Sequence, residues 1–343
     1  MKLSICIPTF NRASHLRNCL NSIIVSGLAE RNDVEICISD NGSTDSTRQV
    51  VEEARQKIPV HYSRNEQNLG IPRNFLKAVE MARGDFAWLL GDDDLLVPSA
   101  LDAMIELIDA HTDVDFFYIN SFHLTTEYVL AYPQPFDTVM LPQKMEPFSS
   151  WRDDKELPFF KLIDPRISFD FLGGMFLAVF RREKWLAHAT VLDSRAIVDA
   201  NTFSSFDNTF PHVKIFASAF RNSSAYVYSQ PLSVCLSGAR EWAPMFPLVR
   251  SVRLIEALDE YRKQGLPLMR YLWCRNHALL YFIPDMVYIL LRGERAGRQY
   301  VRPFKLFLVN VLYPFCLVSF FLYFVRKVKR LLVDRHRFRT QPF

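Results

Sequence analysis

Short apolar segments alternate with amphipathic helical segments along the first third of the chain, and this alternation limits the folds it can adopt. The apolar segments have the length and composition of buried strands. They cover residues 3–7, 34–39, 60–63, 86–90 and 115–122. Strands that alternate with helices form parallel sheets covered on both faces. We therefore predict an α/β fold with a mostly parallel sheet over residues 1–122.

Polar clusters follow four of these expected strands. They lie at residues 8–12, 40–45, 64–70 and 91–94. In open α/β sheets, ligands bind beyond the carboxyl ends of the strands, so the clusters predict a binding edge. The sequence lacks GxGxxG after the first strand and also lacks the GxxxxGK[ST] phosphate loop. These absences exclude the usual dinucleotide-binding dehydrogenases and P-loop enzymes.

An acidic triplet, Asp92, Asp93 and Asp94, follows the apolar segment 86–90. Adjacent carboxylates repel one another and resist desolvation, so their burial needs a compensating cation. Mg²⁺ and Mn²⁺ prefer oxygen ligands, and Mg²⁺ commonly binds through one or two carboxylates together with substrate phosphates. The triplet therefore predicts a metal-bound diphosphate. The alternative is a solvated acidic turn that caps the next helix.

Charge is distributed unevenly along the chain. Twelve Lys or Arg residues between 292 and 339 face two acidic residues, a net charge of +10, although the whole chain carries only +4. A strongly basic terminal segment favours an anionic surface as its partner. Because these basic residues flank an apolar segment instead of lining a polar groove, we expect no nucleic acid partner.

The apolar segment 306–325 has 20 residues without a formal charge, which is long enough to span a bilayer. However, Asn310 and Pro314 interrupt it, and basic residues on both flanks conflict with the positive-inside preference. The segment could re-enter at Pro314, lie in the membrane interface, or belong to a helical bundle. The shorter segment 279–291 could pair with it as a hairpin. We expect residues 241–343 to form a helical, membrane-associating region.

The six cysteines lack the close-pair spacing of metal sites, and we expect them to be reduced thiols of a cytosolic compartment. Polar residues within the first 17 positions interrupt any apolar segment, so we expect no signal peptide.

Together, the motifs at 4–12, 38–45, 68–74 and 92–94 resemble the family 2 glycosyltransferases, which are inverting nucleotide-sugar enzymes of the GT-A fold. The resemblance implies a GT-A-type, Rossmann-like domain over residues 1–240, with a nucleotide-binding half (1–122) and an acceptor half (123–240). It also implies a Mg²⁺ or Mn²⁺ cofactor. The residues that it places at the donor nucleotide are Pro8, Thr9, Arg12, Asp40, Asn68, Gly70, Asn74 and Asp92.

The same resemblance assigns the metal to Asp92, Asp93 and Asp94, with Asp93 as the main ligand. This chain departs from the usual Asp-x-Asp-Asp run, because Gly91 stands at the first position. In the second half, residues 171–176 followed by 179–182 resemble the acceptor-side strand of the family.

Inverting transfer needs a base that removes a proton from the acceptor hydroxyl. Family members often carry an acidic pair at a helix start, and the corresponding stretch here is 206–213. Pro211 suits the first turn of a helix, which would set His212 at the helix start, facing the cleft. A helix N-terminus disfavours imidazolium, so His212 would stay neutral. Asp207 is the rival base, and a purely structural role for His212 is the alternative.

A narrower resemblance, to bacterial abequosyltransferases of O-antigen assembly, rests on 40–47, Pro211-His212 and 230–235. It implies a nucleoside-diphosphate-sugar donor, a lipid-linked saccharide acceptor and a place on the cytoplasmic face of the bacterial inner membrane, peripheral or monotopic. Two other classes stay open. A nucleotidyltransferase would show a glycine-rich loop with Arg and Lys near the first strand, where only Arg12 is present. A non-catalytic membrane scaffold would not need the acidic triplet.

Overall fold

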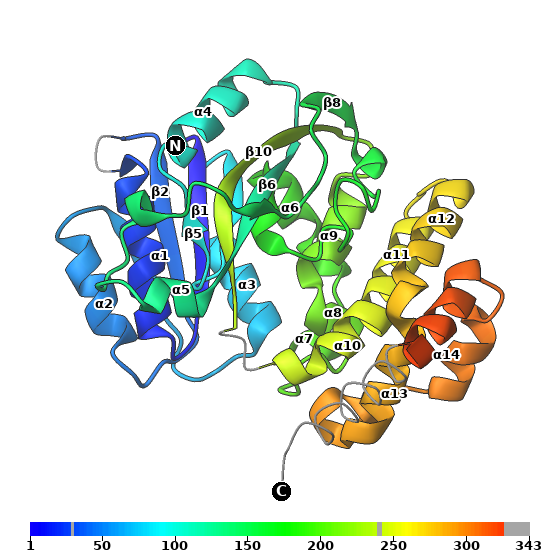
Figure 1. The fold of residues 1–343 in the computed structure, drawn as a ribbon. Coiled ribbons are helices and arrows are strands. Elements are labelled where there is room, and N and C mark those ends of the chain that lie inside the picture. The colour runs from blue at the N-terminus through cyan, green and yellow to red at the C-terminus, as the bar shows by residue number, and fades with distance from the viewer. Residues whose placement is uncertain (29–30, 239–241, 326–343) are drawn as a thin grey trace, which may run out of the picture. The chain divides into compact units, whose positions relative to one another are not determined.

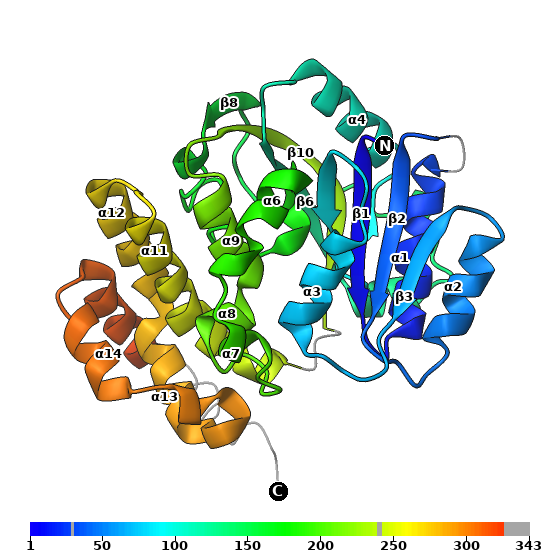
Figure 2. The same ribbon diagram turned by 180° about the vertical axis from the view of Figure 1, so that it is seen from behind.

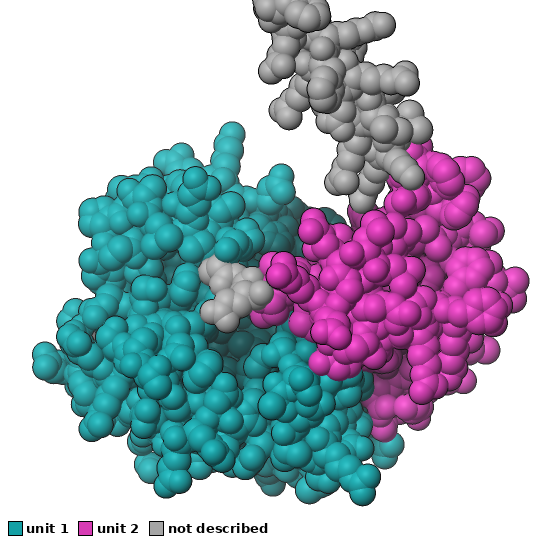
Figure 3. Space-filling view, turned by 90° about the horizontal axis from the view of Figure 1, so that it is seen from below, with its two compact units in different colours: residues 1–241 teal, residues 242–343 magenta. Residues whose placement is uncertain are grey.

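The structure, a computed structural model, describes residues 1–28, 31–238 and 242–325. Contacts divide the chain into two compact units, residues 1–241 and 242–343 (Figure 3). The N-terminal unit is built around a mixed β-sheet, and the described part of the C-terminal unit is helical.

The first four strands of the sheet lie side by side in the order β3-β2-β1-β4 and are parallel. Their bounds are Leu3–Thr9 (β1), Val34–Asp40 (β2), Val60–Arg64 (β3) and Phe86–Leu89 (β4). Every residue of β1, β2 and β4 is buried, which explains why these strands are mostly apolar and do not alternate between apolar and exposed polar residues. The predicted α/β fold with a mostly parallel sheet is confirmed.

Helices cover both faces of this half of the sheet (Figures 1 and 2). The helices α1 and α2 lie on one face, and α3 lies on the other. The helices of this half are Ala13–Val25 (α1), Thr47–Arg55 (α2), Ile71–Glu80 (α3) and Ala100–Ala110 (α4). Pro72 lies in the first turn of α3, where its missing N–H costs no hydrogen bond.

The second half of the sheet mixes strand directions. Its strands are Leu95–Leu96 (β5), Phe116–Thr125 (β6), Glu146–Pro147 (β7), Lys155–Pro158 (β8), Ala178–Arg181 (β9) and Ser224–Ser237 (β10). The strand β9 lies antiparallel between β4 and β6, so β6 runs in the same direction as β4 and β1. The long strand β10 is parallel to β6 and antiparallel to β5. The carboxyl ends of β1, β2, β4, β6 and β10 therefore lie on the same edge of the sheet.

Aromatic side chains form much of the hydrophobic core around the second half of the sheet. Phe116 of β6 meets Phe216 edge to face at a centroid distance of 4.9 Å. Phe180 of β9 stacks on Trp185 at 4.7 Å. The helices of this half are Thr126–Leu130 (α5), Arg182–His188 (α6), Ser194–Ile197 (α7), Phe206–Thr209 (α8) and Pro211–Ala219 (α9). All six cysteines of the chain are buried thiols.

Of the expected acceptor-side strand, residues 171–176 followed by 179–182, only the second part is a strand, β9, and the prediction for 171–176 was wrong. Phe171 and Leu172 have φ angles of 51° and 68°, in the left-handed region, and the strand β9 begins only at Ala178. The cause is Asp170, whose carboxylate accepts hydrogen bonds from Ser168 Oγ at 2.6 Å and from the Gly174 N–H at 2.7 Å. These bonds close a tight turn instead of extending the chain.

The described part of the C-terminal unit consists of short helices, of which the longer ones are Leu254–Lys263 (α11), Leu268–Ala278 (α12), Phe282–Arg292 (α13) and Pro303–Asn310 (α14). Residues 314–325 are also helical. The segment 306–325 is therefore interrupted at 311–313. Among the described residues, no helix is both long enough and apolar enough to cross a membrane.

The polar residues that interrupt the two apolar segments are buried and paired. Asp285 of α13 accepts hydrogen bonds from Arg250 at 2.6 and 2.9 Å, and Asn310 accepts from Arg275 at 3.0 Å. Because Phe282, Asp285, Met286 and Ile289 are buried, α13 is a packed helix of this unit. The basic flank after residue 325 lies outside the described residues.

Candidate active site

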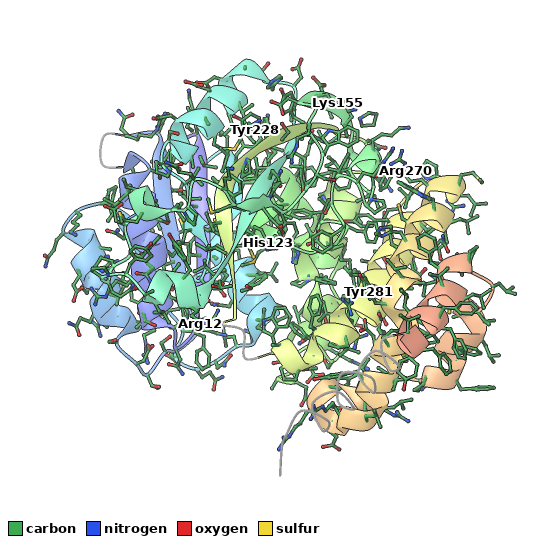
Figure 4. The ribbon with its side chains drawn as sticks, in the orientation of Figure 1. Arg12, His123, Lys155, Tyr228, Arg270 and Tyr281 are labelled. Atoms are coloured by element: carbon green, nitrogen blue, oxygen red, sulfur yellow. The ribbon has the colours of Figure 1, made fainter. Side chains whose placement is uncertain are left out.

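The acidic triplet lies in the turn between β4 and β5, at the edge where β1 ends. All three carboxylates are buried. Thr9, at the end of β1, donates its hydroxyl to Asp92 Oδ2 at 2.8 Å. Arg12 Nη1 lies 3.0 Å from Asp92 Oδ1 and 3.3 Å from Asp93 Oδ2. The structure thus brings Thr9, Arg12, Asp92 and Asp93 together, and Figure 4 labels Arg12 at this edge.

Arg12 compensates only part of this negative charge. Burial, followed by the neighbouring charge of Asp93, raises the pKa of Asp92 to about 7. A further cation near Asp92 and Asp93 would favour the ionised carboxylates.

A divalent metal suits this site as a shared ligand of protein and substrate. Asp92 and Asp93 point oxygens at the same Arg12 nitrogen, so their carboxylates converge. Among the described residues, however, no three His, Cys, Asp or Glu side chains form a cluster that could hold a metal. The residues therefore fit an ion that takes one or two protein carboxylates and completes its shell with phosphate oxygens and water.

Gly91 makes room for Asp94. A Cβ atom at position 91 would lie 2.6 Å from Asp94 Oδ2 and 3.0 Å from Asp93 Oδ1. The Gly91 N–H also donates to Asp94 Oδ2 at 3.3 Å. The departure of this chain from the usual Asp-x-Asp-Asp run thus has a local steric reason.

Asp40, at the end of β2, is fully buried. Each of its two carboxylate oxygens accepts a hydrogen bond. Oδ1 accepts from the Ser43 N–H at 2.8 Å, and Oδ2 accepts from the Tyr62 hydroxyl at 2.6 Å. In this arrangement the carboxylate fixes the turn 40–43 and the end of β3. The turn does not cap α2 through Ser43 or Thr44; Asp45 accepts from the Thr47 N–H at the start of that helix.

A group of asparagines ties the loops of this edge together. Asn74 of α3 donates to the carbonyl oxygens of Ser39 at 3.0 Å and Thr9 at 3.3 Å. Asn41 donates to Asn68 Oδ1 at 2.7 Å, and the same oxygen accepts from the Gly70 N–H at 2.8 Å. These bonds place Asn68, Gly70 and Asn74 beside the ends of β1 and β2. Pro8 lies in β1 opposite Ser39.

Gly70 adopts a φ of 85°, a conformation that favours glycine. It precedes α3 and leaves the backbone free to turn from Asn68 into the helix.

His212 lies at the second position of α9 and is almost fully buried, with 3% of its surface exposed. Its Nε2 contacts the Gly173 carbonyl oxygen at 3.0 Å, so this nitrogen carries the proton. Nδ1 has no hydrogen-bond partner among the described residues. Burial lowers the pKa of His212 to about 4, which keeps the ring neutral.

Asp207 of α8 is held by other protein groups. Its Oδ2 accepts from Lys214 Nζ at 2.6 Å and from the Asp193 N–H at 2.6 Å. The acceptor half nevertheless approaches the donor half, since the His212 ring lies 6.1 Å from the Phe75 ring of α3.

Sequence reasoning missed several residues that build this edge: Asn11, Asn41, Ser43, Asp45 and Tyr62. Asn11 and Asn41 lie within the polar clusters that follow the expected strands, so their position in the sequence could have indicated a role at this edge. Tyr62 carried no such signal, because its role depends on the pairing of β2 with β3.

Comparison with known proteins gives these clusters a context. Residues 4–163 match the family model "Glycosyl transferase family 2". This part of the chain, slightly less than half of its 343 residues, is therefore a glycosyltransferase family 2 domain.

Among individual relatives, the chain is similar to the abequosyltransferase RfbV of Salmonella typhimurium, with 32% identity over 249 residues. This match covers 68% of the chain and 66% of that protein, just under two thirds of its length. A second relative is the poly(ribitol-phosphate) beta-N-acetylglucosaminyltransferase TarS of Staphylococcus aureus, with 32% identity over 32% of the chain and 19% of that protein.

Solved structures show the same fold. The crystal structure of residues 1–349 of S. aureus TarS in complex with UDP matches with a TM-score of 0.54 and 18% identity, covering 83% of this chain and 72% of that one. The structure of TarS 1–349 with UDP-GlcNAc matches with a TM-score of 0.51 and 18% identity, covering 83% and 81%.

Proposed function

We propose that this protein is an inverting, metal-dependent glycosyltransferase that moves a sugar from a nucleoside diphosphate to a saccharide of a surface polysaccharide or O-antigen. The observation that carries the proposal is the convergence of Thr9, Arg12, Asp92 and Asp93 where β1 and β4 end. The similarity to an abequosyltransferase supports the polysaccharide role and a deoxyhexose donor.

The donor diphosphate would lie against Arg12, Asp92 and Asp93. A bound Mg²⁺ or Mn²⁺ would supply Lewis-acid stabilisation of the charge on the departing diphosphate. Arg12 would hold Asp92 and Asp93 in place and add positive charge beside that leaving group. Asp40, Asn68, Gly70 and Asn74 would shape the nucleotide pocket, because they fix the loops next to Thr9 and Pro8.

His212 is the base that we propose for the acceptor hydroxyl. It is neutral, and Nε2 is occupied by the Gly173 carbonyl, which leaves the Nδ1 lone pair to receive a proton. Asp207 is the less suitable base because its Oδ2 is already occupied by Lys214 Nζ and the Asp193 N–H.

The substitution His212→Gln separates a base from a structural residue. A glutamine can place its amide N–H near the Gly173 carbonyl, but it offers no basic nitrogen at the position of Nδ1. A base role predicts loss of transfer with normal melting, and a structural role predicts retained transfer. Asp207→Asn is the matched variant for the rival base.

The reaction class itself is tested by incubating the full chain with nucleotide-sugars and Mn²⁺ or Mg²⁺. Slow release of nucleoside diphosphate supports the transferase. Exchange of pyrophosphate into nucleotide would instead identify a nucleotidyltransferase. If neither reaction occurs with any donor, our transferase proposal is wrong, and a non-catalytic scaffold is favoured. Full activity in excess chelator would show that the reaction does not depend on a metal, contrary to this proposal.

A lipid-linked saccharide is the acceptor that the C-terminal unit favours. Phe304, Leu312 and Phe321 are 75%, 90% and 69% exposed, whereas Asn310 and Ser319 of the same segment are buried. The segment thus turns its apolar side chains outward, and Arg302 and Lys305 beside it are exposed. This pattern suits an interfacial contact with anionic lipid on the cytoplasmic face of a bacterial inner membrane.

The membrane contact is tested by flotation with vesicles that contain phosphatidylglycerol. We expect the intact chain to float and the double variant Phe304→Ser, Phe321→Ser to stay at the bottom. Val139→Ser, which alters an exposed residue of the N-terminal unit, is the control. If the intact chain does not float, the membrane proposal is wrong, although the transferase proposal is unaffected.

A further inference from the structure

Three aromatic rings form a stack on the acceptor half of the N-terminal unit. The ring of Phe148 lies 4.4 Å from that of His123, with an interplanar angle of 24°, and 4.7 Å from that of Phe169, with an angle of 25°. His123 is exposed, and Phe169 exposes 45% of its surface. One end of this stack, the ring of Phe169, is therefore open to solvent.

The stack begins on β6, two strand positions from β5, which directly follows the acidic triplet. His123 is near the carboxyl end of β6 and pairs with Cys235 of β10. The neighbouring residue of β10, Val234, pairs with Leu95, which directly follows Asp94. Two strand spacings therefore separate the start of β5 from β6, or about 10 Å. Figure 4 shows His123 on the sheet and Arg12 nearer the edge where β1 ends.

The His123 side chain projects from the face of the sheet opposite to a separate apolar cluster. Phe122 and Leu124, its neighbours in β6, pack against that cluster with Leu95 and Leu236. Because side chains alternate between the two faces of a strand, His123 lies on the other face. The aromatic stack is thus not part of that cluster.

The surroundings of the stack suit a sugar better than a lipid or an apolar protein partner. His123, itself exposed, pairs across the strands with the exposed Glu146. Among the described residues of the N-terminal unit, the other large exposed apolar side chains lie in other loops and helices. The apolar surface is therefore a single ring wide, with the polar side chains of His123 and Glu146 nearby. A pyranose has the same character, with an apolar C–H face and hydroxyls around its rim.

We propose that the exposed face of Phe169 binds a pyranose ring of the saccharide acceptor, with Phe148 and His123 holding the phenyl ring in place. This inference rests on the proposed transferase function and names one of its acceptor subsites. The start of β5 and β6 lie about 10 Å apart, and the Phe169 ring lies two ring contacts beyond His123, so the bound ring would be one sugar of the acceptor saccharide.

Saturation-transfer NMR with the full chain tests the subsite. The probes are methyl α-D-mannopyranoside, methyl α-L-rhamnopyranoside and methyl β-D-galactopyranoside. We expect at least one of them to receive saturation from the wild-type protein, mainly at the protons of one ring face. Phe169→Ala should weaken this binding about three- to tenfold, and Phe169→Trp should preserve it. Phe304→Ala, which removes an exposed ring from the C-terminal unit, should have no effect.

Release of nucleoside diphosphate from nucleotide-sugars by the same variants separates this inference from the proposed function. If hydrolysis occurs and no glycoside binds, or if Phe169→Ala binds as wild type does, the subsite is wrong and the transferase proposal stands. If glycosides bind in a Phe169-dependent way but no donor is hydrolysed, the saccharide-binding surface is supported and the proposed transferase function is wrong. For Phe169→Ala, the expected combination is donor hydrolysis at the wild-type rate and glycoside binding weakened about three- to tenfold.

Discussion

Arg12 Nη1 lies 3.0 Å from Asp92 Oδ1 and joins the loop after β1 to the turn after β4. Because the same nitrogen also lies 3.3 Å from Asp93 Oδ2, one guanidinium stands where two carboxylates converge. A divalent ion that binds these carboxylates must share them with Arg12 or move it aside. Arginine and metal are therefore partial competitors for the same negative charge.

Arg12→Ala should make the protein less stable and more responsive to metal. Removing one member of a largely buried ion pair costs about 3 kcal/mol, and protonation of Asp92 would limit the loss. Thermal melting should show a lower Tm without metal and a larger rise in Tm with Mn²⁺ than wild type shows. Arg12→Lys, which keeps a positive charge, should lie between the two. An equal or smaller response of Arg12→Ala to Mn²⁺ would disprove the competition.

Asp93→Asn should abolish turnover while leaving the fold intact. The amide is nearly isosteric with the carboxylate but lacks its charge, so stabilisation of the leaving diphosphate is lost. We expect release of nucleoside diphosphate to fall about 10²–10³-fold, as when one preorganised charge-stabilising group is removed. Asp85→Asn, an exposed substitution just before β4, is the matched control. Turnover of Asp93→Asn close to the wild-type rate would show that the main ligand lies elsewhere.

Gly91→Ala tests whether the position of the Asp94 carboxylate matters. The added Cβ would lie 2.6 Å from Asp94 Oδ2, so this buried side chain must move. If Asp94 contributes to the site, nucleoside diphosphate release should fall to about the level of Asp94→Asn. Gly91→Asp, which would restore the usual family pattern, should be impaired for the same steric reason. Activity of Gly91→Ala equal to wild type, with Asp94→Asn impaired, would contradict this steric account.

Asn74→Ala should destabilise the N-terminal unit through the loops of the binding edge. The buried Asn74 amide donates to the Thr9 and Ser39 carbonyl oxygens, which would lose these donors. We expect the free energy of unfolding in urea to fall by about 1–3 kcal/mol. Asn74→Asp should be worse, because it sets an acceptor oxygen against those carbonyls. Equal stability of wild type and Asn74→Asp would show that the network contributes nothing.

The parts of the fold that local periodicity determines could be predicted from the sequence. The strands β1 and β2 are fully buried, so most of their residues are apolar, and the polar clusters after them mark the binding edge. Pairings between distant segments could not be predicted. The strand β5 has only two residues, and β9 lies antiparallel between two strands that come before it in the chain.

At the site, the sequence could place residues on an edge but not assign their partners. Asp40 was expected at the donor nucleotide, but its protein partners could not be foreseen: Ser43 follows it in the turn, and Tyr62 is brought close only by the pairing of β2 and β3. The same limit applies to Asp285. It interrupts an apolar segment in the sequence, and its partner Arg250 is 35 residues away.

His212 should make stability depend on pH in an acidic window. Its pKa is about 4 in the folded protein, because the ring is buried, and about 6.5 without that burial. Between these values the unfolded chain binds the proton more readily, so stability is full above pH 6.5 and falls as the pH drops toward 4. The loss from this residue is up to about 3 kcal/mol. Urea unfolding of wild type and His212→Gln across this range measures it, because the glutamine does not titrate. As the pH falls, wild type should lose stability relative to His212→Gln, and parallel curves would mean that His212 does not remain neutral for the reason given.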